Sequence, residues 1–213
     1  MGDPHLKEVY DEMSTRFDKQ RTHAYFHELT QYLQSVIPPK SSILEIGSGT
    51  GGYCIELNKY GCSCKGVDFS EKMVVVAKEN NRIARAHCVF KVADVEQEIP
   101  FRGKFDFIIS MDSWEFFPHP GAVMRNVFNS LKDNGLFIII TPHMLFAPAV
   151  ILAERLHIKK LSPAYTYFNS FKRRVSRLAY ENGFLFEKKR FIFHGMSVIY
   201  TLRKKAKIDD HSN

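Results

Sequence analysis

The residues most able to do chemistry begin at Glu45, where the sequence runs Glu-Ile-Gly-Ser-Gly-Thr-Gly-Gly to position 52. Glycines at this spacing permit a tight turn and let the backbone approach a ligand closely. Asp68 ends the next apolar run, about 20 residues further on, where an acid can accept hydrogen bonds from both ribose hydroxyls of an adenosine. A carboxylate at Glu45 suits a cationic amino-acid group and would repel phosphates. The pattern therefore favours an adenosine ligand without a pyrophosphate over a nicotinamide dinucleotide.

Four side chains further along the chain could exchange a proton with a substrate, namely Asp112, Glu115, His119 and His143. They follow the expected fourth and fifth strands, at the carboxyl edge of the sheet where ligands bind. Histidine titrates near neutral pH, so either imidazole could act as a general base. Asp112 and Glu115 are three positions apart, so one turn of helix would point both side chains the same way.

Short apolar runs alternate with helical patterns from residue 42 onward, and these elements must position the side chains named above. The runs that predict buried strands are residues 43–46, 64–67, 88–92, 105–110 and 136–140. Continuous apolar strands that alternate with helices indicate a parallel sheet covered on both faces, in a doubly wound α/β fold. Residues 184–193 and 197–202 predict an antiparallel hairpin at one edge of that sheet.

These motifs, in this order and at this spacing, resemble the Rossmann-like, class I SAM-dependent methyltransferases. The resemblance covers about residues 42–142, where 43–52 match the first motif of the family, 66–70 the second and 93–95 the third. It implies a seven-stranded sheet that is mostly parallel, with an antiparallel C-terminal hairpin. It also implies that the cofactor is S-adenosylmethionine (SAM).

The resemblance further implies roles for individual residues around SAM. Asp68 would hold the ribose, Asp94 would accept from the adenine amino group, and apolar neighbours would pack against the adenine. Tyr10 lies in a segment similar to one that covers the cofactor in many members, and Arg21 could meet the SAM carboxylate. The full set of residues expected at the cofactor is Tyr10, Arg21, Glu45, Gly47, Ser48, Gly49, Gly51, Asp68, Phe69, Met73, Ala93, Asp94, Val95 and Ser110.

The segment after the fourth strand is also similar to the ubiquinone-pathway O-methyltransferases, in which a Glu-x-x-Glu-His sequence holds a divalent metal. Here the corresponding positions are Asp112, Glu115 and Phe116. An apolar ring replaces the imidazole, so no metal site is predicted.

The sequence divides into parts of different character. The expected parts are an N-terminal helical arm over residues 1–40 (helical over 5–36), a SAM-binding core over 41–203 with a substrate-lid insertion at 143–167, and a flexible tail over 204–213. The insertion mixes aromatic, aliphatic and basic residues. We therefore expect methyl transfer to oxygen or nitrogen of a small acceptor that is aromatic, anionic or lipid-like, and a peripheral membrane contact would suit the last.

Charge is spread unevenly over a chain whose net charge is +7. Residues 151–213 carry 14 of the 30 Lys and Arg but only 5 of the 23 Asp and Glu, which indicates an anionic partner or a solvated basic surface. Two alternatives therefore stay open beside the small-molecule enzyme. One is a tRNA methyltransferase that acts on a modified wobble uridine, and the other is a non-catalytic SAM-binding scaffold subunit.

The four cysteines predict a reducing environment. Cys62 and Cys64 are separated by one residue, which is too close for an ordinary disulfide. With no apolar run long enough to span a bilayer and no secretory signal at the N-terminus, free thiols and a cytoplasmic location are expected.

Overall fold

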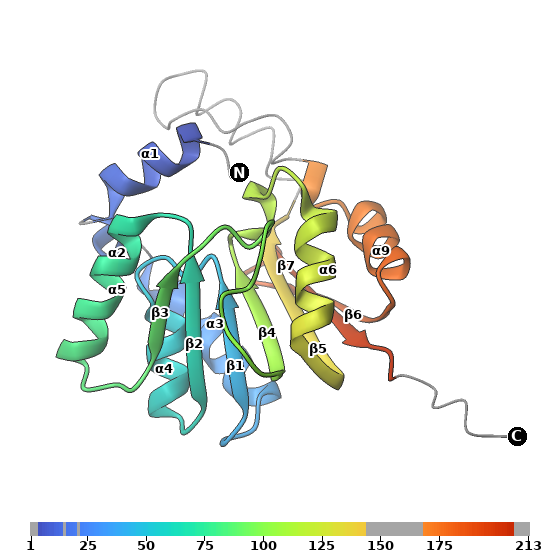
Figure 1. The fold of residues 1–213 in the computed structure, drawn as a ribbon, viewed down its shortest axis with the longest axis horizontal. Coiled ribbons are helices and arrows are strands. Elements are labelled where there is room, and N and C mark those ends of the chain that lie inside the picture. The colour runs from blue at the N-terminus through green and yellow to red at the C-terminus, as the bar shows by residue number, and fades with distance from the viewer. Residues whose placement is uncertain (1–3, 15, 21, 144–167, 207–213) are drawn as a thin grey trace, which may run out of the picture.

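The computed structural model describes residues 4–14, 16–20, 22–143 and 168–206, and within them the chain builds one seven-stranded sheet (Figure 1). The strands lie in the order β3-β2-β1-β4-β5-β7-β6. Their bounds are β1 Ser42–Ile46, β2 Ser63–Asp68, β3 Val89–Val92, β4 Phe105–Met111, β5 Leu131–Pro142, β6 Phe184–Ile192 and β7 Ser197–Lys204. The first five strands pair in parallel, whereas β7 pairs antiparallel with both β5 and β6. The prediction of a mostly parallel α/β sheet with an antiparallel C-terminal hairpin at one edge is confirmed.

Helices cover both faces of this sheet (Figure 1). One face carries α3 (His23–Val36), α4 (Gly52–Lys59) and α5 (Glu71–Ile83), and the other carries α6 (Pro120–Ser130) and α9 (Lys172–Glu181). Successive strand residues point to opposite faces. In β1, Ile43 accordingly packs on the side of α3, α4 and α5, while Leu44 packs on the side of α6 and α9. Both side chains are fully buried, which explains why the strand reads as a continuous apolar run.

The order in which strands are added to the sheet reverses at β1: β2 and β3 lie on one side of it, and β4 and β5 lie on the other. In doubly wound sheets, ligands bind at such a switch point, outside the carboxyl ends of the strands. Here the glycine-rich loop follows β1, Asp68 is the last residue of β2, and Asp112 comes directly after β4. The topology therefore brings three widely separated parts of the sequence to one edge of the sheet.

The N-terminal arm, which was expected to be helical over residues 5–36, is divided into three helices. The helices are α1 (Pro4–Met13), α2 (Phe17–Gln20) and α3. At the end of α1 the hydroxyl of Ser14 donates to the carbonyl oxygen of Asp11 at 2.9 Å, a side-chain bond that competes with helix continuation. Thr22 is extended and begins α3, and Ile37, held extended before Pro38, ends it as predicted.

The start of β5 also differs from the prediction. We expected a strand over residues 136–140, but β5 begins at Leu131 and contains an irregularity before Leu136. Asn134 takes a left-handed φ of 63°, which asparagine tolerates better than most residues. The pairing with β4 shifts register across this irregularity.

The four cysteines, Cys54, Cys62, Cys64 and Cys88, are free and buried, as predicted. In the part of the chain that the structure describes, no helix is both long and apolar enough to cross a membrane.

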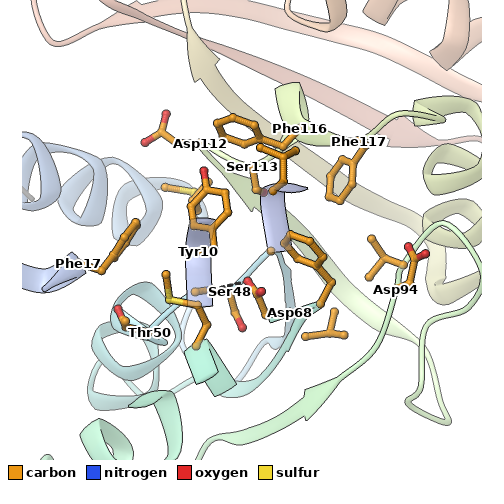
Figure 2. Close-up of a pocket in the computed structure, with 18 of the residues that line it drawn as sticks. Tyr10, Phe17, Ser48, Thr50, Asp68, Asp94, Asp112, Ser113, Phe116 and Phe117 are labelled. Carbon is orange, nitrogen blue, oxygen red and sulfur yellow. Dashed lines mark hydrogen bonds between the residues drawn. The ribbon is translucent and has the colours of Figure 1, made fainter. Parts of the chain in front are cut away.

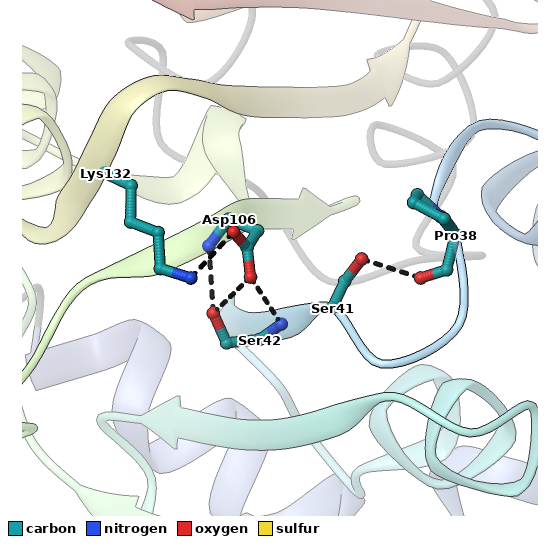
Figure 3. Close-up of polar contacts among 5 residues, drawn as sticks. All are labelled: Pro38, Ser41, Ser42, Asp106 and Lys132. Carbon is teal, nitrogen blue, oxygen red and sulfur yellow. Dashed lines mark hydrogen bonds and ion pairs between the residues drawn. The ribbon is translucent and has the colours of Figure 1, made fainter.

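A polar cluster around Asp106 joins the beginnings of β1 and β4 at the edge of the sheet opposite the switch point (Figure 3). The carboxylate accepts hydrogen bonds from the backbone N–H of Ser42 at 2.8 Å, from the Ser42 hydroxyl at 2.7 Å and from Lys132 Nζ at 2.8 Å. Desolvation opposes the charged form, but these donors together lower the pKa of Asp106 below its usual range. The carboxylate thus fixes how β1 starts relative to β4.

Replacing Asp106 with alanine should lower the free energy of unfolding by about 1–2 kcal/mol at pH 7, because Ser42 and Lys132 lose their shared acceptor. Urea denaturation measures this loss. Since the folded pKa is depressed, the stabilisation is present above the unfolded pKa and fades as the pH falls through the folded value. Asp133→Ala is the matched control, since Asp133 is half exposed and lies 3.4 Å from Lys204. An equal loss in both variants would contradict this account of the cluster.

Candidate active site

A cavity of about 330 Å³ opens at the carboxyl edge of the sheet (Figure 2). This volume lies within the usual range of small-molecule sites. Its walls come from the arm, the glycine-rich loop, the end of β2, the segment after β3 and the segment after β4. The residues that line it include Tyr10, Phe17, Tyr25, Gly47, Ser48, Gly49, Asp68, Phe69, Met73, Ala93, Asp94, Val95, Asp112, Ser113, Phe116 and Phe117.

The glycine-rich loop forms the floor of this cavity. Gly47, Gly49 and Gly51 have φ values of 66°, 50° and 81°, in the left-handed region that favours glycine. A Cβ on Gly47 would lie 2.5 Å from the Cβ of Ser113, so this glycine also permits close packing against the segment after β4. Gly51 begins α4 and lies outside the lining residues. The spacing read from the sequence therefore produces the expected tight turn.

Asp68 projects into the cavity from the end of β2 and is 7% exposed. Its two carboxylate oxygens accept the backbone N–H groups of Gly49 at 2.8 Å and of Ser70 at 2.9 Å. Burial raises the pKa of Asp68 to about 6, although these N–H donors pull it back down. Each oxygen can accept a further hydrogen bond, so the carboxylate is rigidly held and still able to take a ligand hydroxyl.

Glu45 and Ser110 lie behind the cavity wall. Glu45 is 1% exposed, and its carboxylate accepts the backbone N–H of Cys54, in the first turn of α4, at 3.2 Å. Ser110 is fully buried and shares a 2.7 Å hydrogen bond with Ser113, which donates to the carbonyl oxygen of Ile46. Neither residue is among those that line the cavity. Their direct contact with a cofactor stays a prediction.

The segment after β3 contributes Ala93, Asp94 and Val95 to the cavity lining, and Asp94 lies on the side away from Phe17 (Figure 2). The Asp94 carboxylate accepts the backbone N–H of Glu96 at 3.0 Å, so it also holds the local turn. Phe69 lies in the wall as well.

Met73 also lines the cavity and is 1% exposed. The Ser70 hydroxyl accepts its backbone N–H at 3.1 Å and so caps α5. The cavity lining thus combines apolar side chains such as Phe69, Met73 and Val95 with the carboxylate of Asp94.

The arm closes over the cavity through two aspartates that the sequence analysis did not single out. Asp11 accepts the Ser70 hydroxyl at 2.5 Å, and Asp18 accepts the Thr50 hydroxyl at 2.7 Å. Tyr10, next to Asp11 in the chain, packs edge-on against Phe116, with ring centroids 5.6 Å apart. Burial, and then the nearby charges of Glu115, Asp68 and Asp112, raise the pKa of Tyr10 far above its usual value. Arg21 lies outside the described residues.

Asp112 also lines the cavity and is held by Tyr25 of α3. Both of its carboxylate oxygens accept from the Tyr25 hydroxyl at 2.8 Å, and Ser197 shares a 2.9 Å hydrogen bond with the same hydroxyl. Asp112 has a left-handed φ of 49°, and such strained residues cluster at functional sites. Burial raises the pKa of Asp112 to about 6, while the Tyr25 hydrogen bond lowers it.

Residues 17–185 match the methyltransferase domain family. The chain belongs to this family. The match confirms the resemblance to class I SAM-dependent methyltransferases, and with it the prediction of a SAM-dependent methyltransferase. SAM is accordingly the cofactor of this methyltransferase domain.

The domain is similar to several curated methyltransferases. A Bacillus subtilis (strain 168) protein named as a methyltransferase, YqeM, is 27% identical over 150 residues, which cover 68% of this chain and 60% of that protein. The ubiquinone biosynthesis O-methyltransferase of Bradyrhizobium diazoefficiens is 30% identical over 115 residues, or 53% of this chain and 45% of that protein. The chain thus spans about half of the length of the curated relatives it matches.

Solved structures of other proteins share the fold. The PH0226 protein of Pyrococcus horikoshii OT3 superposes with a TM-score of 0.72 at 26% identity, over 87% of this chain and 92% of that one. Magnesium protoporphyrin IX methyltransferase (ChlM) of Synechocystis PCC 6803, with bound S-adenosylhomocysteine (SAH), gives a TM-score of 0.68 at 19% identity, over 94% of this chain and all of that one. At 19% identity, the similarity to ChlM shows only that the two proteins share a fold.

In this methyltransferase domain only one of the four proton-exchange candidates, Asp112, lines the cavity. Glu115 is 4% exposed in a short 3-10 helix (η1, Trp114–Phe116) and accepts the Thr141 hydroxyl at 2.9 Å. His119 begins α6, and His143 packs edge-on against Phe191. The expected common direction of Asp112 and Glu115 does not occur, because a left-handed residue precedes the turn that carries Glu115.

In the part of the domain that the structure describes, no group of three His, Cys, Asp or Glu side chains is close enough together to bind one metal ion. At the three positions that correspond to the metal-binding segment, Asp112 is bound by Tyr25, Glu115 by Thr141, and Phe116 packs on Tyr10.

Sequence reasoning missed Tyr25, which lines the cavity and binds Asp112. Its place in α3 matches the helical spacing of neighbouring apolar residues, so it read as one of the residues that pack α3 against the sheet. The one available signal was its hydroxyl, because a buried tyrosine needs a hydrogen-bond partner.

Proposed function

We propose that this domain transfers the methyl group of SAM to a hydroxyl oxygen of a small aromatic acceptor. The observation that carries the proposal is the Asp112 carboxylate, which lines a cavity whose wall also contains the rings of Phe116 and Phe117. An aromatic hydroxyl could pack against Phe116 and Phe117 while it donates to Asp112. Transfer to a hydroxyl profits from a base, whereas the leaving group of a sulfonium needs no acid.

The cavity residues suit SAM in their chemistry. Asp68 would accept the ribose hydroxyls, and Asp94 would accept the adenine amino group, with Phe69 and Met73 against the adenine. The Ser48 hydroxyl is buried at the loop and has no hydrogen-bond partner among the described residues, as expected for a group that a ligand satisfies.

SAM supplies a methyl group on a positively charged sulfur that is already a good leaving group. The chain's own residues would then align the acceptor, exclude water and remove one proton. Asp112, with a pKa of about 6, is ionised at neutral pH and would take the proton of the acceptor hydroxyl. Tyr25, fixed by Ser197, would hold the Asp112 carboxylate in place as a positioning residue.

The relatives support oxygen as the acceptor atom without deciding it. The Bradyrhizobium protein is named an O-methyltransferase, but a Halorhodospira halochloris relative, 29% identical over 113 residues, is named a sarcosine/dimethylglycine N-methyltransferase. Of these two acceptor types, an aromatic hydroxyl suits the ring-lined cavity better.

Transfer of a labelled methyl group from SAM to a panel of acceptors tests the proposal. The panel should contain catechols and phenols, secondary amines such as sarcosine, and total tRNA. We expect label on phenolic oxygen, with kcat/KM rising as the pH increases through about 6, where Asp112 ionises. Label on amines or on tRNA alone would contradict the proposal, and the second outcome would restore the wobble-uridine alternative.

Tyr25→Phe should move this pH profile. Because the Tyr25 hydroxyl stabilises the charged form of Asp112, its loss raises the Asp112 pKa, and the midpoint of kcat/KM should rise by about half a unit to one unit. Tyr32→Phe is the control, since Tyr32 lies on the same helix but bonds Thr201 and does not line the cavity. An unchanged midpoint in Tyr25→Phe would show that Tyr25 does not act through Asp112.

A further inference from the structure

A second hollow, of about 640 Å³, lies between the start of α6 and the face of α9, outside the cofactor cavity. The two helices lie side by side on one face of the sheet (Figure 1). The hollow is lined by Glu96, Gln97, Pro118, His119, Pro120, Gly121, Ala122, Arg125, Arg174, Arg177 and Leu178. Glu96 and Pro118 also line the cofactor cavity, so the two spaces share a wall.

Three arginines face this hollow, Arg125 from α6 and Arg174 and Arg177 from α9. In the described parts of the chain, neither Arg125 nor Arg174 forms an ion pair, and Arg177 approaches Glu181 only at 3.8 Å. The Nε atom of Arg174 is buried and has no hydrogen-bond partner among the described residues. A buried guanidinium N–H without an acceptor is costly, and an anion in the hollow would satisfy it.

Glu96 is the acidic residue that lines the hollow, and its second carboxylate oxygen is buried without a hydrogen-bond partner among the described residues. One carboxylate oxygen accepts the backbone N–H of His119 at 2.7 Å. Burial raises the pKa of Glu96, which that N–H and His119 partly offset. Three guanidinium groups therefore face a single acid that is buried, and burial favours the neutral form of that acid.

The start of α6 adds to the positive field. Its first turn contains no acidic residue, and His119 at the N-cap makes no side-chain cap hydrogen bond. The positive end of the helix dipole therefore points to the hollow without a counter-charge from its own first turn.

We propose that this hollow binds a phosphate group of a small phosphorylated molecule. The planar fork of an arginine matches the oxygens of a phosphate, and two or more such forks on neighbouring helices suit a phosphate better than a single carboxylate. The site goes beyond the methyltransferase activity and does not depend on it. Its shared wall with the cofactor cavity makes coupling between the two ligands testable.

Isothermal titration with tripolyphosphate at low salt tests the site. We expect the wild type to bind at sub-millimolar concentration, and Arg174→Gln and Arg125→Gln each to weaken binding at least fivefold. Arg173→Gln is the matched control, because it removes the same charge from α9 at an exposed position outside the hollow, and it should change binding less than twofold. Circular dichroism and SAH binding of each variant show whether it folds.

Competition experiments distinguish a small phosphorylated ligand from the phosphates of a nucleic acid. Competition by inorganic phosphate and glycerol phosphate, with no dependence on RNA length, supports a small ligand. Tighter binding of longer RNA oligonucleotides that phosphate does not displace would overturn the proposal in favour of a nucleic-acid surface. Absence of tripolyphosphate binding would overturn the proposal. An equal loss of affinity in Arg173→Gln would also overturn it, because it would show that the arginines act only through the overall positive charge of the surface.

Discussion

Asp112→Asn should lower kcat/KM for methyl transfer at least about 100-fold while SAH binding stays within about threefold of the wild type. The amide keeps the size of the side chain and a hydrogen-bond acceptor for Tyr25, but it cannot take a proton from the acceptor. Asparagine also tolerates the left-handed φ of 49° at this position, so the backbone should not move. Single-turnover transfer of labelled methyl at pH 8 measures the effect.

The same substitution should make the protein more stable at that pH. Burial raises the folded pKa of Asp112 from 3.8 to about 6, so the contribution to stability is complete below pH 4 and is lost as the pH rises through 6. Asparagine carries no charge to bury, and Asp112→Asn should therefore unfold with about 1–3 kcal/mol more free energy at pH 8 and with no gain at pH 4. Full activity, or a stability gain that is the same at both pH values, would contradict the role given to this carboxylate.

Gly47→Ala should weaken SAH binding more than about tenfold and destabilise the fold. An added Cβ would stand 2.5 Å from the Cβ of Ser113, closer than any ordinary contact, and a left-handed φ costs a non-glycine residue about 1–2 kcal/mol. Moving the loop to relieve that clash displaces Ser48 and Gly49, which line the cavity. Calorimetry with SAH and urea denaturation report the two effects.

Gly103→Ala is the control that separates the cost of a left-handed φ from the effect of a clash at the cavity. Gly103 has a φ of 95°, but a Cβ there would meet nothing within 4 Å, and it lies away from the cavity. This control should lose stability and keep SAH affinity. A second substitution, Ser113→Gly, should recover part of the loss in Gly47→Ala, because it removes the atoms that clash. Normal SAH binding in Gly47→Ala would show that the loop does not shape the site.

The parts of the site that the sequence made predictable are those set by local backbone geometry. The glycines from Gly47 to Gly51 and the acid at the end of β2 follow from strand, turn and helix in succession, and the structure places Asp68 and the loop together as this pattern requires. The sheet was predictable for the same reason, because buried parallel strands read as continuous apolar runs.

The parts that escaped prediction depend on contacts between distant segments. Tyr25 and Asp112 are 87 positions apart and meet only because α3 packs beneath the segment after β4. The arm is fixed by Asp11 and Asp18, whose partners lie in other elements, and no local pattern marks them. His119 was expected at the reaction centre, but residue order does not reveal which way a side chain turns after a strand, and it faces the second hollow instead.

Titration of the purified protein with SAH in a calorimeter, beside an Asp68→Asn variant, tests the central claim most directly. The account predicts micromolar binding to the wild type and at least tenfold weaker binding to the variant, because an amide cannot replace the buried carboxylate that would accept both ribose hydroxyls. Asp133→Asn, an exposed change of the same kind, should bind SAH as the wild type does. Absence of wild-type binding up to millimolar SAH, or equal affinity in Asp68→Asn, would contradict the assignment of this cavity to SAM.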